Sequence, residues 1–242
     1  MIDSLRNHPF AVKAFFTQSL VLTYAVPVSL VNELVPSPLE PDLLHGEWGF
    51  VAAAFVETRN LRASGFPVWT GNDFLLAGYR VYVRYTNKAG RRLRGLYILG
   101  SQTDSRKMQV FGNLFTHYRY SRSSLCFVRD AGTLSINSVT DGLSVVVDLS
   151  LPSPALPAGS PFNDWKEARR FSGPMPFTFS ISGSDVVVVE GVRSNWLPKP
   201  VALLQAHIPF FMEPSFPPTK PANAFIVEGV PYHWKKGVVE KW

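Results

Sequence analysis

The sequence contains only one cysteine, Cys126, so no disulfide can form within the chain. A single cysteine is typical of proteins that fold in a reducing compartment. Cys126 stands in the alternating apolar run SSLCFVRD, which predicts a buried position on a strand. The alternative is a reactive thiol.

The chain also lacks an uninterrupted apolar run of about 18 residues, the length needed to span a bilayer. Its N-terminal stretch is apolar but is interrupted by Arg6, His8, Lys13 and Gln18, and it shows no secretory signal. We therefore expect a cytoplasmic protein with no stable membrane insertion.

Several familiar catalytic motifs are missing. There is no Gly-x-Ser-x-Gly elbow, no P-loop and no dinucleotide-binding glycine pattern. The histidines show no HExxH motif and no close pair of the kind that zinc sites use. They are His8, His45, His117, His207 and His233. The sequence thus predicts no cofactor and no metal, although a metal site built from distant histidines stays open.

What the chain does contain favours strands. Its 46% hydrophobic and 13% aromatic residues suffice for a substantial core. Valine-rich runs such as DVVVVEGV favour strands, and the 20 prolines leave few stretches free for helices. The composition therefore predicts a β-rich α+β fold.

Alternating apolar and polar residues divide the chain into elements. Residues 1–18 are expected to be a helical or irregular lead-in. The expected strands are 19–26, 47–60, 74–86, 92–101, 124–130, 133–139 and 143–149, with a hairpin at 176–194. The expected short helices are 28–35, 105–116 and 163–171. We predict one domain over residues 1–242, in which the Pro-rich segment 150–161 is a loop rather than a linker between two domains.

Much of the net charge of +6 lies between residues 80 and 107, where the cations face only one acid, Asp104. The turn NKAGRR favours a solvated hairpin whose charges discourage aggregation. The alternative is a surface for anions or nucleic acid. No zinc-finger, RNA-binding or helix-turn-helix pattern accompanies these charges, so we predict no nucleic-acid partner.

Ionisable and aromatic side chains are densest between residues 74 and 122. Alternate residues of a strand share a face, so Arg80, Tyr82 and Arg84 are predicted to point one way, and Tyr79 with its alternate neighbours the other. Arg80 is flanked by apolar residues and should be partly buried, which requires an anionic partner. That partner is either a substrate carboxylate, which suits the planar guanidinium, or a protein carboxylate. The protein candidates are Asp104, Glu57 and Glu190.

His117 is a candidate general acid or base, because the unperturbed pKa of histidine is about 6.5. Its alternative role is that of a hydrogen-bonded loop residue. Tyr82 and Tyr118 are able to donate hydrogen bonds to an enolate oxygen, or simply to pack with satisfied hydroxyl groups. The predicted catalytic residues are therefore His117, Arg80 and Tyr82. The predicted substrate-binding residues are Tyr118, Tyr97, Tyr79 and Arg193.

The segment FLLAGYRVYVRY also resembles a family. It is similar to a block of the DUF2071 branch of the acetoacetate decarboxylase-like superfamily, whose Arg-x-Tyr-Val strand is matched by Arg80, Tyr82 and Val83. Further similar blocks follow in the same order. They are the Val-Pro segment at 25–27, the Leu-Val-Pro turn at 34–36, the strand with Trp48, and the later segments GPMPFTFS and VVVEGVRSNWLPKPV.

The resemblance implies a strongly curved, cone-shaped β-barrel with short flanking helices and a central cavity. In the decarboxylases of this superfamily, a lysine forms a Schiff base with a β-keto acid. Their Gly-aromatic-Pro-Lys-Lys pattern falls on residues 114–118, where neither lysine position holds a lysine. Their strand glutamate falls near Leu76. We therefore expect no Schiff base at the usual place.

Two functions stay open. The one we favour is an enzyme of small-molecule, secondary metabolism, of lyase, isomerase or cyclase type, acting on an oxo-acid or polyketide-like substrate. It would decarboxylate, isomerise or cyclise by noncovalent acid–base chemistry and enolate stabilisation. The other is a noncatalytic carrier of an apolar metabolite. Both have a small apolar or oxo-acid ligand as partner, and both are compatible with a homo-oligomer.

Overall fold

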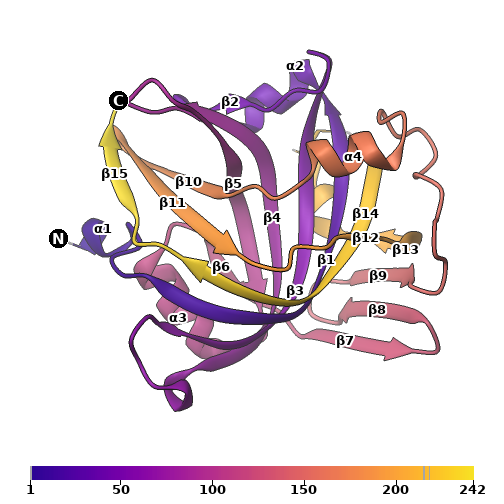
Figure 1. The fold of residues 1–242 in the computed structure, drawn as a ribbon, viewed down its shortest axis with the longest axis horizontal. Helices are drawn as coiled ribbons and strands as arrows, with labels where there is room; N and C mark the ends of the chain where they lie inside the picture. The colour runs from indigo at the N-terminus through magenta and orange to yellow at the C-terminus, as the bar shows by residue number, and fades with distance from the viewer. Residues whose placement is uncertain (1, 215, 218) are drawn as a thin grey trace.

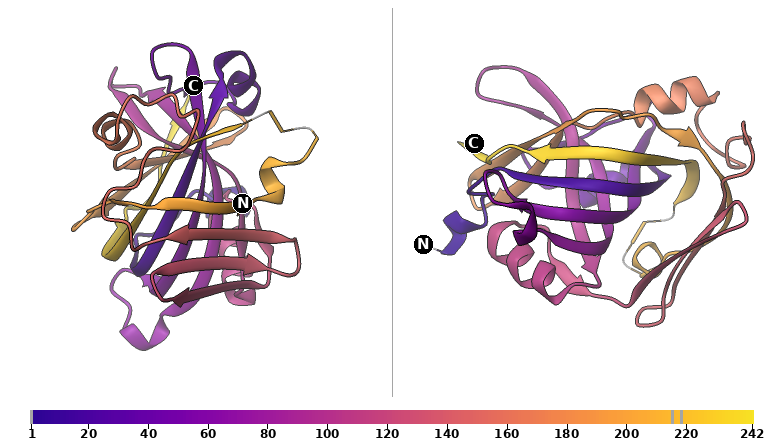
Figure 2. Two further views of the ribbon diagram at one scale, coloured as in Figure 1. Left: turned by 90° about the vertical axis from the view of Figure 1, so that its right-hand side faces the viewer. Right: turned by 60° about the horizontal axis from the view of Figure 1, so that its bottom comes forward.

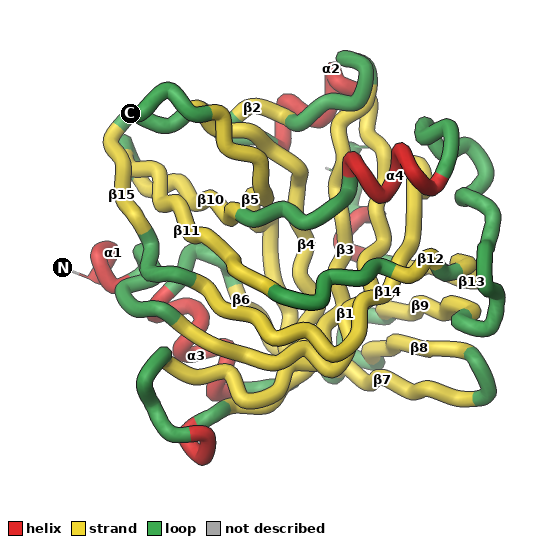
Figure 3. The backbone as a smooth tube through the Cα atoms, in the orientation of Figure 1, coloured by secondary structure: helices red, strands yellow, loops and turns green. Residues whose placement is uncertain are grey.

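Strands make up most of the structure, a computed structural model that describes residues 2–214, 216–217 and 219–242 (Figures 1 and 3). The helices are short and lie at the margins of the sheets. They are α1 (Ile2–Leu5), α2 (Val28–Val31), α3 (Arg106–Phe115) and α4 (Trp165–Phe171), with 3₁₀ turns η1 (Asn32–Leu34), η2 (Val68–Thr70) and η3 (Pro209–Phe211). The predicted β-rich α+β class is confirmed. No helix of the described chain is long and apolar enough to cross a bilayer.

The strands form two sheets. The larger sheet contains β1 (Val12–Pro27), β2 (Glu40–Pro41), β3 (Trp48–Ala63), β4 (Asn72–Thr86), β5 (Arg92–Thr103), β6 (Tyr120–Arg122), β10 (Phe177–Ser182), β11 (Asp185–Arg193), β12 (Lys199–Pro200), β14 (Lys220–Trp234) and β15 (Val238–Lys241). The smaller, antiparallel sheet has the order β13-β9-β8-β7. Its strands are β7 (Leu125–Asp130), β8 (Thr133–Ser138), β9 (Leu143–Asp148) and β13 (Ala202–His207).

The larger sheet closes on itself. Its strands pair in the order β14-β1-β3-β4-β5-β10-β11, and β11 pairs again with β14. The return pairing joins residues 191–193 to residues 232–234. Figure 2 shows the resulting rolled shape, in which β14 and β1 run beside each other. We call this ring of strands the closed sheet.

The face around which the closed sheet rolls is identified by a row of paired residues. Arg80 pairs with Ala52, Ala52 with Thr23, and Thr23 with Asn223, so these residues from four neighbouring strands share one face. The Tyr82 hydroxyl reaches across β3 to Thr23, at 3.2 Å between the oxygens. The small side chain of Ala52 leaves room for this crossing. We call this face the inner face.

Aromatic side chains cover one end of the inner face. Phe50 stacks on Phe162 from the long loop, at 5.1 Å between ring centroids, and contacts Phe171 of α4 at 4.9 Å. The helix α4 starts at Asp164, whose side chain accepts a hydrogen bond from the backbone of Glu167. In Figure 1, α4 lies in front of the upper ends of β1, β3 and β14.

The opposite, outer face packs against the smaller sheet. Its buried side chains include Leu20, Phe55 and Val81, which join Leu134 and Ile136 of β8 in one core. Tyr79 also faces this side and stacks on Phe210 at 4.1 Å. Aromatic pairs of this kind contribute about 0.5–1.5 kcal/mol beyond burial. The alternation predicted for β4 is confirmed, because Tyr82 joins the inner core and its neighbour Val81 the outer one.

Most elements predicted between residues 19 and 194 match within a few residues, but the lead-in does not. Strand β1 begins at Val12, so residues 12–18 are a strand and not irregular. The adjacent phenylalanines at 15 and 16 hide the alternation, because Phe15 points to solvent and Phe16 is buried. Strand β14 was not predicted. It contains Pro221 and Pro231, and proline normally argues against a central strand.

The predicted burial of Cys126 is wrong. Its strand, β7, is the edge strand of the smaller sheet and buries only alternate side chains. Leu125 faces the core, and Cys126 is exposed. Residues 150–161 contain neither helix nor strand, and strands from both sides of this segment enter the closed sheet.

Candidate functional site

Two arginine side chains from distant strands meet on the inner face. Arg80 lies on β4, and Arg193 ends β11. Arg80 is within electrostatic reach of Arg193 and of the phenols of Tyr82 and Tyr232. Burial lowers the pKa of both guanidinium groups, but arginine stays protonated in proteins. The inner face therefore carries two like charges close together. With Tyr118, described below, these residues form what we call the arginine–tyrosine cluster.

Arg193 is fixed on two aromatic rings and keeps one group without a partner. Its Nη1 donates a 2.7 Å hydrogen bond to the Tyr232 hydroxyl, and its Cζ lies 4.6 Å from the centroid of the Trp196 ring. Its Nη2 is buried and has no hydrogen-bond partner within the described part of the chain. Gly191 makes room for this arrangement, since a Cβ at that position would lie 2.4 Å from the Tyr232 hydroxyl oxygen.

The loop after α3 brings Tyr118 to the same place. Asn113 accepts a hydrogen bond from the Tyr120 amide and donates one to its carbonyl, both at 2.8 Å. This clamp holds the loop against the helix, and Gly112 lets the Tyr120 ring approach, because a Cβ there would lie 2.4 Å from it. The Tyr118 hydroxyl is buried beside Thr178 of β10, with no hydrogen bond of ordinary geometry.

Tyr118 and Tyr232 keep their protons at neutral pH. Burial raises the pKa of Tyr118 above the usual range, and the neighbouring phenols of Tyr120 and Tyr232 add to this. Burial also raises the pKa of Tyr232, although Arg193 and Arg80 oppose the shift. These groups are therefore hydrogen-bond donors at neutral pH. A buried hydroxyl without a partner costs about 1–3 kcal/mol, a penalty that a ligand oxygen would remove.

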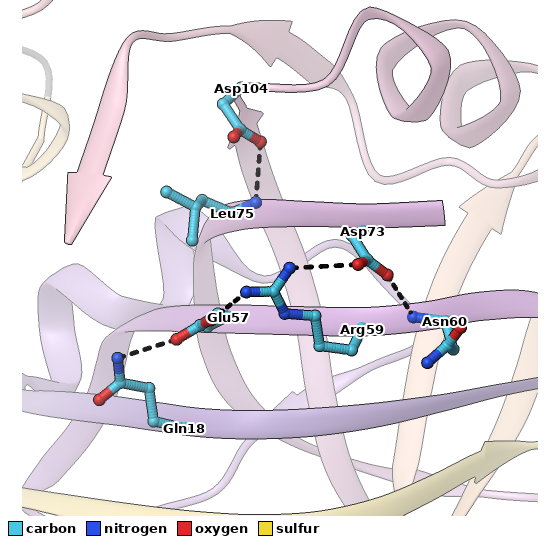
Figure 4. A network of polar contacts seen from close by, with 7 residues as sticks. All are labelled: Gln18, Glu57, Arg59, Asn60, Asp73, Leu75 and Asp104. Atoms are coloured by element: carbon cyan, nitrogen blue, oxygen red, sulfur yellow. Dashed lines mark hydrogen bonds and ion pairs between the residues drawn. The ribbon is translucent and has the colours of Figure 1, made fainter. Parts of the chain in front are cut away.

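The carboxylates that the sequence suggested as partners of Arg80 bind other groups. Figure 4 shows that Glu57 accepts hydrogen bonds from Gln18 and Arg59, at 3.1 and 2.9 Å. In the same view, Asp104 accepts from the backbone amide of Leu75 at 2.8 Å. Neither acid is left to neutralise the inner face.

The third suggested partner, Glu190, forms an ion pair with Lys235 at 2.8 Å. Among the residues that the structure describes, no carboxylate lies within ion-pair distance of Arg80 or Arg193. A cluster of two guanidinium groups and several neutral phenols can hold an anion and donate hydrogen bonds to it. The described residues also contain no group of three His, Cys, Asp or Glu side chains that could hold a metal ion.

The model of the DUF2071 family, described as an uncharacterized conserved protein, matches residues 14–231. The chain belongs to the DUF2071 family. No curated protein matches this DUF2071 chain. Solved structures do match it along nearly its whole length, at low sequence identity, so these likenesses show a shared fold.

Acetoacetate decarboxylase from Legionella pneumophila has a TM-score of 0.61 at 12% identity, covering 96% of the DUF2071 chain and 88% of its own. An acetoacetate decarboxylase-like enzyme from Sphingomonas wittichii has 0.60 at 10%, covering 98% and 94%. The enduracididine biosynthesis enzyme MppR, complexed with pyruvate, has 0.52 at 9%, covering 96% and 90%. The resemblance recognised in the sequence is thus confirmed at the level of family and fold.

The DUF2071 structure brings together four of the residues predicted for the site. Arg80, Tyr82, Tyr118 and Arg193 contribute to the inner face. Tyr82 has its hydroxyl satisfied by Thr23. No Asp, Glu or Lys belongs to the cluster as defined. The resemblance placed the two lysine positions of the decarboxylases at residues 117 and 118, and the second position holds Tyr118, whose hydroxyl is buried.

Tyr79 and Tyr97, also predicted for the site, lie on the outer side. Tyr79 faces the outer side, where its hydroxyl donates a 2.7 Å hydrogen bond to Gln102. Tyr97 pairs with Val81 on β5 and packs against the same outer core. The Nε2 atom of His117 lies 3.1 Å from the side-chain oxygen of Asn7, near the N-terminus. His117 directly precedes Tyr118, which enters the cluster.

Tyr232 was missed in the sequence because its strand was missed. The run AFIVEGVPYHW starts with four consecutive buried apolar residues, which is typical of a buried strand, but Pro231 stands directly before Tyr232. The position of Tyr232 also depends on strand register, because Tyr232 pairs with Arg193 on β11 and with Ala14 on β1. Such pairings between distant segments are invisible to local patterns.

The basic hairpin is more nearly neutralised than its sequence indicated. Arg84 and Arg94 share the fully buried Asp42, with 2.5 Å between Arg84 Nε and Asp42 Oδ1. Arg92 pairs with Glu40 at 3.0 Å. Glu40 belongs to β2, which lies beside β4, and Asp42 directly follows this strand. Both acids are distant in sequence from the hairpin. Counting acids only within the hairpin therefore overstated its charge.

Proposed function

We propose that this DUF2071 protein is an enzyme that binds a small oxo acid and stabilises its enolate without a covalent intermediate. The observation that carries the proposal is the pair Arg80 and Arg193 on the inner face, with no carboxylate beside either among the described residues. Buried charges need partners, and guanidinium groups are suited to carboxylates. An oxo acid supplies that carboxylate.

The phenols supply the second requirement of enolate chemistry. When a proton leaves the carbon beside the carbonyl, or when carbon dioxide leaves a β-keto acid, the electron pair moves onto the carbonyl oxygen. Tyr232 lies near both arginines, and Tyr118 lies within electrostatic reach of Tyr232. Both phenols hold their protons, so we propose that they donate hydrogen bonds to this oxygen. Donors aimed at a developing negative charge lower the barrier. Returning the proton to carbon completes the reaction.

His117 is proposed as the group that moves the proton. A histidine titrates near neutral pH, and this one directly precedes Tyr118. The fold supports an oxo-acid ligand by analogy, since MppR, which shares the fold, is complexed with pyruvate. We also propose that the chain is one domain, since strands from both sides of residues 150–161 enter one closed sheet. We further propose that it acts in the cytoplasm.

A carrier of an apolar acid is the second candidate. A hollow of about 530 Å³ lies against β1, β11 and β14 and favours it. Exposed Phe15, Val68 and Val192 line this hollow together with Lys13 and Arg62. An apolar rim with cations would bind such an acid without any chemistry.

Deuterium exchange distinguishes the two functions. Pyruvate and acetoacetate are incubated with the protein in D₂O, and loss of the proton signals beside the carbonyl is followed by NMR. An enzyme of the proposed kind accelerates exchange above the spontaneous rate, and Arg80→Gln abolishes the acceleration. Tyr79→Phe, on the outer face, is the matched control and keeps it. Binding without exchange in a wider series of apolar oxo acids would establish the carrier instead.

A second measurement tests the noncovalent mechanism. Borohydride is added during incubation with pyruvate, and the intact protein is weighed by mass spectrometry. A Schiff base would be reduced to a stable adduct on a lysine, and we expect no adduct. A mass increase located on Lys13, at the hollow that also contacts Arg193 and Tyr232, would overturn the noncovalent mechanism.

A further inference from the structure

A separate pocket of about 610 Å³ lies between α4 and the inner face of β14. Its walls are apolar: Trp165 from α4, Trp196 from the turn after β11, Phe225 from β14, and prolines at 174, 198 and 200. We call it the tryptophan pocket. Its volume and flat aromatic walls suit a small molecule with an apolar or aromatic body.

One side of α4 surrounds this pocket with positive charge. Lys166, Arg169 and Arg170 are spaced i, i+3 and i+4, so they share a side of the helix, and all line the pocket. The acid of this helix, Glu167, instead binds Asn163 and lies 3.3 Å from His45. No Asp or Glu stands among the described lining residues.

Cations at the end of a helix also interact favourably with the helix dipole, which accounts for Arg169 and Arg170. It does not account for Lys166, nor for the buried polar atoms of the pocket. The charge alone would therefore not define a site, and the polar atoms provide the independent observation.

Two buried polar atoms of the lining have no partner. Asn223 is only 3% exposed, and its Nδ2 donates to Ser172 at 2.8 Å, but its Oδ1 accepts no hydrogen bond from any described residue. The indole Nε1 of Trp196 is likewise buried and donates to none. The pocket lining thus holds one buried acceptor and one buried donor without a hydrogen-bond partner among the described residues. A ligand hydroxyl group can donate to the first or accept from the second.

We propose that the tryptophan pocket binds a small aromatic or apolar acid that carries a hydroxyl group. The body packs between the tryptophans, the carboxylate lies toward Lys166, Arg169 and Arg170, and the hydroxyl group meets Asn223 or Trp196. This site is distinct from the arginine–tyrosine cluster and does not rest on the proposed function. The two are neighbours, because the ring of Trp196 that lines the pocket also lies 4.6 Å from Arg193 Cζ.

The probe for this site is 8-anilinonaphthalene-1-sulfonate, an aromatic anion whose emission rises in apolar pockets. Three competitors differ by one group each: 4-hydroxyphenylacetate, phenylacetate without the hydroxyl group, and tyramine with an amine in place of the carboxylate. We expect one probe per chain, displaced best by 4-hydroxyphenylacetate, less well by phenylacetate and not by tyramine. Displacement by tyramine as readily as by the acid would overturn the proposal, as would failure of the probe to bind.

Substitutions locate the probe. Arg169→Ala combined with Arg170→Ala removes two exposed cations without disturbing the core, and should weaken binding about fivefold or more. Arg91→Ala, in the exposed hairpin turn, is the matched control and should not change it. Trp196→Phe keeps a ring but removes the donor, so the advantage of the hydroxylated acid should shrink. Unchanged binding in the double variant would place the probe elsewhere and refute the site.

The site and the proposed enzyme can fail separately. Arg80→Gln should leave binding of the probe unchanged while it abolishes deuterium exchange in pyruvate. A protein that exchanges deuterium but ignores the probe would refute only the tryptophan pocket. A protein that binds the probe but catalyses no exchange would refute only the enzyme.

Discussion

Arg193 donates its 2.7 Å hydrogen bond to a phenol, Tyr232, and to no carboxylate. A phenol that keeps its proton cannot neutralise a guanidinium group, so the charge of Arg193 stays available to a ligand. Arg80 lies within electrostatic reach of Arg193 and Tyr232, and it too has no carboxylate within ion-pair distance among the described residues. This relationship supports the proposal that the inner face binds an anion.

Replacing either arginine should weaken oxo-acid binding. Arg80→Gln and Arg193→Gln each remove one of two charges that face the ligand carboxylate, and we expect a loss of about 2 kcal/mol, or roughly 30-fold in Kd. Isothermal titration with pyruvate measures it. Arg91→Gln, exposed in the hairpin turn, serves as control. Wild-type affinity in both cluster variants would mean that the carboxylate binds elsewhere.

Removing a phenol should affect turnover more than affinity. Tyr118→Phe is expected to lower the rate of deuterium exchange about 100-fold, because the lost hydrogen bond strengthens only as charge develops on the ligand oxygen. Burial raises the pKa of Tyr118 and Tyr232, so exchange should also persist as pH rises through about 10, the ordinary pKa of tyrosine. A rate that falls with a midpoint near that value would contradict these donors.

The role of His117 can be separated from ligand binding. His117→Ala should reduce the exchange rate about 100-fold and leave the Kd for pyruvate nearly unchanged, since general acid–base catalysis contributes mainly to the chemical step. His207→Ala, on the exposed strand β13, is the control. If His117→Ala changes thermal stability but not the exchange rate, His117 is a structural residue of its loop and not the acid–base group.

Gly191→Ala should displace the Tyr232 ring within the arginine–tyrosine cluster. The added Cβ would lie 2.4 Å from the Tyr232 hydroxyl oxygen, so this ring must move. We expect a destabilisation of about 1–3 kcal/mol and slower exchange. Gly78→Ala is a matched control on the same face, where a Cβ would meet no atom closer than 4.0 Å. Equal unfolding midpoints in denaturant for the two variants would refute this view of Gly191.

Stability at high pH should depend on Tyr85. Burial, with a hydrogen bond to Glu240, raises the pKa of Tyr85 to about 12. A phenol whose folded-state pKa lies above its unfolded value of about 10 stabilises the fold below pH 10 and loses this contribution as pH rises to about 12. Tyr85→Phe should therefore flatten the decline in unfolding free energy over that window by up to about 2 kcal/mol. Parallel curves for both proteins would contradict it.

Local patterns predicted the elements well where each is made by neighbouring residues. The alternation along β4 identified both faces of the strand, and helix α3 followed from its apolar spacing. Local patterns could not predict which distant segments contact each other. Asp42, which binds Arg84 and Arg94, directly follows the two-residue strand β2, which no local pattern reveals, and its ion pairs neutralise part of the basic hairpin.

The candidate site was predicted in part for the same reason. Arg80, Tyr82 and Tyr118 were identified because they stand in one dense segment. Tyr232 was not, because its position depends on pairing with Arg193 and Ala14, and pairing partners are set by the closure of the sheet. Tyr79 shared the dense segment but faces the outer core, where its ring stacks on Phe210.

The strand that closes the sheet has a consequence for how the molecule is made. Strand β1 is translated well before its neighbour β14, so the nascent chain must carry an unpaired edge on β1 until β14 has emerged. Pairings between such distant segments fold slowly. The surroundings of Arg80 are likewise incomplete until Tyr232 of β14 is in place. The proposed ligand site is therefore completed only when β14 docks between β1 and β11.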